Sequence, residues 1–184
     1  MAKNFFASCM ASEDVRSLKY TGVFFANNAE AEIHDGALVV KGDMMDHDVY
    51  AGLKDPNKYK IAAPAAATDP VDVVDYVDRS HGEIMGVNYR EGIKTFGLVA
   101  PAGTPVRVRH PQKHDTAYFA ADNFASAPTE GKFAVATAGS TLWTPANAID
   151  TTKTCIKIEF AKPVTEGMIE TGKEYFVTFV NVIE

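Results

Sequence analysis

Short apolar runs alternate with clusters of glycine, proline, asparagine and aspartate along the whole chain. The turn signals recur about every 8–12 residues, which is the spacing of a β-sandwich or β-barrel. The runs that read as strands are 22–26, 29–33, 37–40, 59–62, 71–77, 83–89, 93–100, 106–109, 116–119, 132–136, 141–143, 154–160 and 175–183. We therefore expect an all-β fold, a compact β-barrel or sandwich of short antiparallel strands with little helix.

Some of these runs also predict how their side chains are oriented. The Asp35-Gly36 pair lies between two extended runs and indicates a hairpin turn. Residues 106–109 alternate valine with arginine, so we expect the arginines to form an outward face. In 154–160, Ile156, Ile158 and Phe160 share one face, and 175–183 is apolar on both faces, as in a central strand.

The first twenty residues differ from the rest and predict an extended N-terminal arm. Ser12, Glu13 and Asp14 favour a short helix that continues to about Tyr20. The arm's large apolar side chains are Phe5, Phe6, Met10, Val15 and Leu18. An arm of this length cannot build its own core, so it packs on its own subunit or on a partner. We favour docking on a partner, with these five side chains as the binding residues.

The remaining residues, 21–184, predict one β-rich body, and an internal boundary near 111–115 is the alternative to a single core. Residues 51–70 contain three prolines and an alanine-rich run, so we expect irregular connections with one short strand. With 184 residues, the chain is long enough to bury a substantial core without disulfides.

Composition excludes several classes of function. The net charge is −6, from 24 acidic and 18 basic residues, which disfavours nucleic-acid binding. Only Cys9 and Cys155 are cysteines, which favours reduced thiols over a disulfide framework. The N-terminus lacks the apolar segment of a signal peptide, and no apolar run is long enough to cross a membrane. We expect a protein made in the cytoplasm, with no membrane partner.

Two clusters contain potential metal ligands. Residues 43–48 hold three aspartates and His47, but they lack the glycine and glutamate offsets of a calcium loop. His110 and His114 have the spacing of a zinc pair on a helix, but Pro111 disfavours a helix there. Ser140 lacks the flanking glycines of a nucleophile elbow. We therefore expect no catalytic, metal or cofactor-binding residues, and a protein that is not an enzyme.

Two further features allow binding functions. Arg107, Arg109 and Lys113 form the one local basic patch, which suits an acidic partner better than nucleic acid. Trp143 suits either stacking on a sugar or a place in the core, and the core is the commoner role of a lone tryptophan.

Three segments, 35–43, 82–87 and 131–140, combine alternating strands with small residues. In this pattern of strands and small residues, the chain resembles the head decoration, or capsid cement, proteins of tailed bacteriophages. The resemblance implies a homotrimer on the outside of the virion head that clamps neighbouring major capsid subunits, and it implies no catalytic residues. The alternatives are another virion subunit, of the tail tube or head completion type, or a carbohydrate-binding β-sandwich module that uses Trp143.

Overall fold

The computed structural model describes residues 5–11, 18–76, 99–166 and 169–183. Over these residues the chain is mainly strand and includes a three-residue 3-10 helix, η4 (Ala121–Asn123), which confirms the all-β prediction. Within the same residues no helix has the length and apolar character needed to cross a bilayer. Strands predicted at 83–89 and at most of 93–100 lie outside the described residues.

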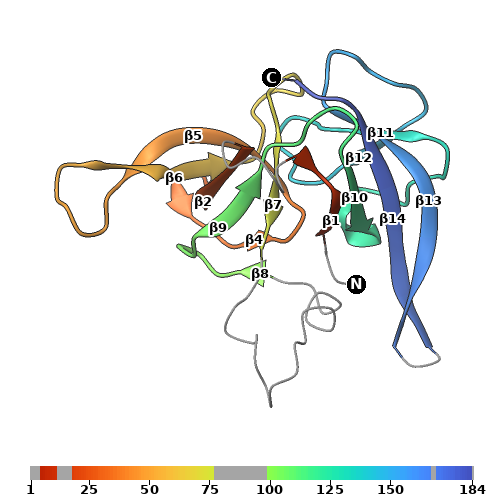
Figure 1. Ribbon diagram of the computed structural model, residues 1–184, viewed down its shortest axis with the longest axis horizontal. Coiled ribbons are helices and arrows are strands. Elements are labelled where there is room, and N and C mark those ends of the chain that lie inside the picture. Colours follow the sequence, from red (N-terminus) through yellow and green to blue (C-terminus); the bar gives the residue numbers. More distant parts are fainter. Residues whose placement is uncertain (1–4, 12–17, 77–98, 167–168, 184) are drawn as a thin grey trace.

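One half of the molecule is an open, antiparallel sheet (Figure 1). Its strands, in spatial order, are β1 (Phe5–Cys9), β10 (Thr116–Ala120), β14 (Ile169–Asn181), β13 (Cys155–Glu166), β11 (Phe133–Val135) and β12 (Thr144–Ala146). The two longest strands, β13 and β14, form a hairpin that extends past the rest of the sheet. We call this half the open sheet.

The other half is a small closed barrel. Its strands, in spatial order, are β2 (Lys19–Ala26), β6 (Lys54–Ala62), β5 (Leu38–Asp46), β7 (Asp72–Asp75) and β9 (Val106–Arg109). The barrel closes because β9 also pairs with β2. The β2–β6 pair is parallel, in contrast to the antiparallel pairing that we expected throughout. The short strands β3 (Ala29–Glu30), β4 (Ile33–His34) and β8 (Val99–Ala100) lie beside it.

The barrel is inserted into the open sheet along the chain. The first strand, β1, pairs with β10, and the whole barrel lies between them in sequence. The chain leaves the barrel after Arg109 and re-enters the open sheet at Thr116, so the passage contains residues 111–115, the alternative boundary considered from the sequence.

Strands β5 and β7 join the two halves because each contributes to two hydrophobic cores. Val39 and Val74 belong to the barrel core. Their neighbours Leu38 and Val73 belong to the core of the open sheet. Successive side chains of a strand point to opposite faces, so one pair of strands can line both cores. The barrel and the open sheet therefore pack through shared strands.

The N-terminal segment belongs to its own subunit. Phe5 and Met10 are buried in the core of the open sheet, and the Phe5 ring lies 5.0 Å from that of Phe119. Leu18 is half-buried, Phe6 lies on β1, and Val15 falls outside the described residues. The positions of Phe5 and Met10 argue against a docking arm and favour the alternative, a segment that completes the subunit's core.

Two buried carboxylates fix this segment at its ends. The backbone amide of Phe5 donates to Asp35 Oδ2 at 3.0 Å, and that of Ala11 donates to Asp115 Oδ1 at 2.8 Å. We expected a helix that continues to about Tyr20, and this predicted end is wrong. Tyr20 belongs to strand β2 and pairs with Val108.

Candidate interaction surface

The acidic cluster at residues 43–48 is paired with lysines rather than arranged around a metal. Asp46 Oδ1 lies 2.6 Å from the Nζ of Lys54, and Asp48 Oδ1 lies 2.8 Å from the Nζ of Lys58. Hydrogen bonding to these ammonium groups, and then their charge, lowers the pKa of both carboxyls. Within the residues that the structure describes, no group of three or more His, Cys, Asp or Glu side chains could hold a metal ion.

The two histidines at 110 and 114 have separate structural roles. His110 Nδ1 lies 2.6 Å from the carboxylate of Asp72, which also accepts a hydrogen bond from the hydroxyl of Tyr20. Burial, and then the negative charge of Asp72, raises the pKa of Tyr20. His114 has a φ of 77°, and its amide donates to the carbonyl of Phe179. These contacts hold the turn between the barrel and the open sheet.

The outward arginine face expected on β9 holds for Arg107, whose side chain is 38% exposed, but is wrong for Arg109. Arg109 is only 3% exposed, and its Nε lies 2.5 Å from Asp75 Oδ2. Arg107 Nη2 lies 2.6 Å from the same oxygen. Asp75 stands opposite Arg107 in the register of β7 and β9, so the neighbouring strand supplies the acidic partner within the chain.

The structure also removes the basis for the carbohydrate-binding alternative. Trp143 is fully buried, and its ring packs edge-on against Phe119 at 5.8 Å and Phe179 at 6.0 Å. A buried ring has no free face on which a sugar could stack. Trp143 is therefore a residue of the open-sheet core.

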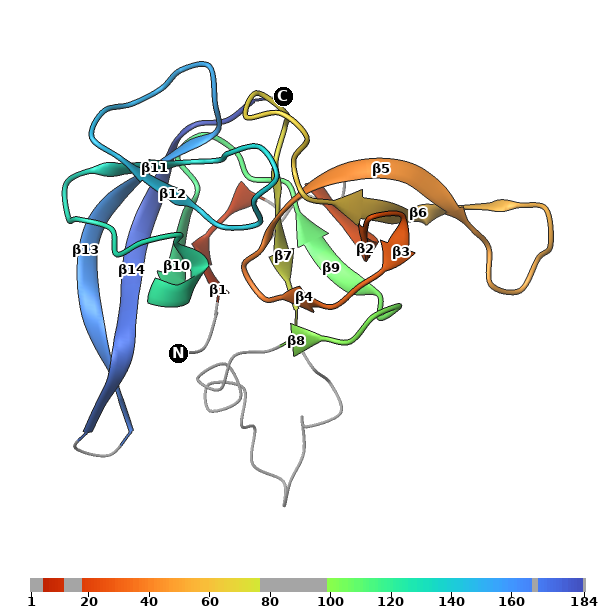
Figure 2. The ribbon, with the colours of Figure 1, turned by 180° about the vertical axis from the view of Figure 1, so that it is seen from behind.

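Among the described residues, the three most exposed of the large apolar side chains, Val49, Tyr50 and Leu53, lie at the end of the β5–β6 hairpin, and Met44 lies nearby. Met44 is 44% exposed, Val49 75%, Tyr50 60% and Leu53 58%. We call residues 44–54 the hairpin tip. The hairpin projects from the barrel, away from the open sheet, in both views of the ribbon (Figures 1 and 2). Clustered exposed apolar side chains on a projecting element make the hairpin tip a candidate binding surface.

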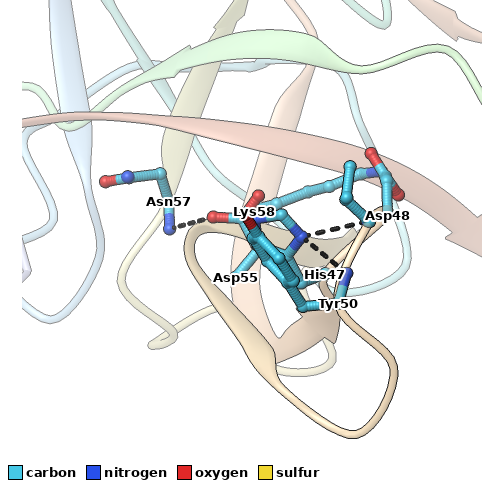
Figure 3. A network of polar contacts seen from close by, with 7 residues as sticks. His47, Asp48, Tyr50, Asp55, Asn57 and Lys58 are labelled. Carbon is cyan, nitrogen blue, oxygen red and sulfur yellow. Dashed lines mark hydrogen bonds and ion pairs between the residues drawn. The ribbon is translucent and has the colours of Figure 1, made fainter.

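The turn at the hairpin tip is held in one shape. The amide of His47 donates to the carbonyl of Leu53 at 2.8 Å. The Nδ1 atom of His47 accepts the amides of Val49 at 3.0 Å and of Tyr50 at 3.3 Å (Figure 3). The His47 and Tyr50 rings lie 4.9 Å apart. Gly52 completes the turn with a φ of 81°, a conformation that glycine adopts without strain.

At the base of the tip, the hairpin is irregular. Its register shifts on both sides of Met44, as β-bulges do, and bulges increase the local twist of a hairpin. The ammonium group of Lys41 lies over the ring of Tyr59 at 3.8 Å and near that of Tyr20 at 4.8 Å. These contacts connect the hairpin to the barrel wall.

A second, smaller apolar surface lies on the outer face of the open sheet. Phe160 is 43% exposed and stacks on Phe176 with ring centroids 5.0 Å apart. Tyr118 lies 4.9 Å from Phe176, and Lys162 Nζ lies 4.6 Å from the Tyr118 ring. Because these rings shield one another, this surface exposes less apolar area than the hairpin tip.

Comparisons with protein-family models, with curated proteins and with solved structures found no match. The all-β class and the exposed surfaces are therefore the observations from which a function can be argued.

Proposed function

We propose that this chain is a structural virion protein, and most specifically a decoration protein on the outside of a phage head. In this role it would bind the major capsid protein and stabilise the contacts between neighbouring capsid subunits. The observation that carries the proposal is the hairpin tip, where four large apolar side chains are exposed on a projecting element. Such a surface suits attachment to another protein.

Two properties of the chain support a place on the outer face of a shell. Its net charge of −6 suits a position away from packaged nucleic acid, which repels an acidic surface. Both arginines of β9 pair with Asp75 and Arg109 is buried, so this strand adds less positive surface than its sequence suggests. We extend the proposal to a homotrimer, as the resemblance implies.

The direct test uses heads of the phage that encodes the chain, purified from a mutant that lacks this gene. The added protein should co-sediment with the heads, reach saturation and raise the temperature at which the heads disrupt. Light scattering of the free protein should give three times the chain mass of 19.9 kDa.

Failure to bind such heads would contradict the proposal. If the purified protein instead assembles into rings or tubes by itself, negative-stain images will show them, and a tail-tube or head-completion subunit becomes the better assignment.

A further inference from the structure

We infer that the hairpin tip is the part of the molecule that enters the partner, and that the partner is a protein with an uncharged, apolar pocket. This inference rests on the proposed function, and it names the residues through which the protein would attach to the head. Val49, Tyr50 and Leu53 are the side chains that fill the pocket, and the flanking ion pairs lie at its rim.

The apolar character of the hairpin tip is concentrated, which distinguishes it from the rest of the described surface. Val49, Tyr50 and Leu53 lie within five consecutive residues, and each is more than half exposed. Elsewhere, large exposed apolar residues such as Ile149, at 46%, are less exposed and come from separate segments. Binding energy concentrates where a few large side chains enter a pocket together.

The two aspartates beside the exposed apolar residues are each paired with a lysine of the same hairpin. Asp46 is paired with Lys54, and Asp48 is paired with Lys58 through both carboxylate oxygens, at 2.8 and 3.0 Å. Asp55 accepts the amide of Asn57 at 2.9 Å (Figure 3). A pocket that receives this tip needs no charge of its own, because an unpaired charge buried there would lower the affinity.

The shape of the hairpin tip is set before binding. His47 accepts two amides of the turn, and its own amide closes the turn onto Leu53. A convex element that is already ordered loses little conformational entropy when it binds. A narrow projecting turn also fits a concave pocket better than a flat surface.

The charge near the tip favours a protein pocket over a lipid surface. From Lys41 to Lys60 the hairpin holds four aspartates and four lysines, so it carries no net positive charge. Such a segment is not drawn to an anionic membrane, which attracts basic segments. A lipid surface and a second copy of this chain are accordingly the two competing outcomes of the test.

The test compares the binding of variants to the same heads. Leu53→Ser and Tyr50→Ser each remove a tip side chain, and Ile149→Ser is the matched control because Ile149 is also exposed but lies outside the hairpin. We expect each tip variant to bind about tenfold more weakly and the control to bind like the wild type. His47→Phe keeps a ring but removes the acceptor, so it should also weaken binding. His47→Asn supplies an amide oxygen as acceptor, so it should bind the heads more tightly than His47→Phe does.

Each outcome has one meaning. If the wild type does not bind heads, the proposed function fails, and this inference fails with it. If the wild type and the tip variants bind equally, the inference alone is overturned. Binding of the wild type to phosphatidylcholine or phosphatidylglycerol vesicles, lost in the tip variants, would assign the tip to lipid instead. If the tip variants have a lower mass than the wild type in light scattering, the tip would be assigned to contacts between copies of this chain. Melting curves equal to the wild type should show that all variants fold.

Discussion

The carboxylate of Asp35 accepts a hydrogen bond from the backbone amide of Phe5, at 3.0 Å. The other carboxylate oxygen of Asp35 accepts a hydrogen bond from the amide of Tyr76 at 2.9 Å. The backbone carbonyl of Asp35 accepts a hydrogen bond from the side-chain amide of Asn123. One fully buried residue thus connects the first strand, the end of β7 and the segment after β10. The hairpin that the sequence predicts at Asp35-Gly36 is wrong, because β4 pairs with β8 and β5 pairs with β6 and β7. The Asp-Gly turn is instead a junction between the barrel and the open sheet.

Replacing Asp35 with alanine should strongly destabilise the fold. The change removes both hydrogen bonds of a fully buried carboxyl and leaves two amides without their acceptor, at about 1–3 kcal/mol for each unsatisfied group. We expect the free energy of unfolding in urea to fall by about 3 kcal/mol or more. Asp55→Ala is the control, because Asp55 accepts one local amide bond on the surface, and it should change the value by less than about 1 kcal/mol. Equal losses in the two variants would contradict the junction role.

Removing the side chain of Phe5 should destabilise the subunit by itself. The ring is fully buried against Phe119, and Phe→Ala changes in cores cost about 3–5 kcal/mol. Phe160→Ala, at a position 43% exposed, should cost much less. Deletion of residues 2–10 should lower the melting temperature or make the protein insoluble. A truncated protein that melts like the wild type would revive the docking arm.

Trp143 should report on the packing of the open-sheet core. It is the single tryptophan, and it is fully buried. We therefore expect blue-shifted fluorescence that acrylamide quenches poorly, and a red shift with strong quenching in urea. Sugars should leave the emission unchanged. Efficient quenching in the native protein would mean that the indole is accessible and that the core is arranged differently.

The carboxyl of Asp150 should titrate at a low pH. Hydrogen bonds from the Thr152 hydroxyl, Lys153 and the Thr152 amide lower its pKa from 3.8 to about 2. Because the folded pKa lies below the unfolded one, the group stabilises the fold above about pH 4, and this contribution is lost as the pH falls towards 2. A carbon-13 carboxyl titration should find the low midpoint, and Thr152→Val should raise it. An unchanged midpoint in that variant would exclude the hydroxyl as the main cause.

The sequence predicts most strand positions, because burial on one face leaves a visible pattern. It does not predict a bulge. Ile156, Ile158 and Phe160 alternate and should share a face, yet the register shifts between Ile158 and Phe160. The two isoleucines are fully buried, whereas Phe160 is 43% exposed. One extra residue in a strand reverses the faces that follow it.

The hairpin tip was missed for a related reason. Beyond Val40, strand β5 runs out of the core, so its residues show no burial alternation and read as a loop. The signal that was available is the apolar run from Val49 to Leu53, which interrupts a segment rich in aspartate and lysine. The partner of Arg109 was equally hidden, because Asp75 lies 34 positions away and only the pairing of β7 with β9 brings it near.

The insertion of the barrel between β1 and β10 sets the order in which the nascent chain can fold. Ala11 and its partner Asp115 are 104 positions apart. At ordinary rates of translation, Asp115 leaves the ribosome on the order of 5–20 s after Ala11. The barrel strands all emerge within that interval and can close first. Strand β1 is made before the barrel but is therefore among the last of these strands to reach its place, and Phe5 and Met10 stay accessible to chaperones until β10 appears.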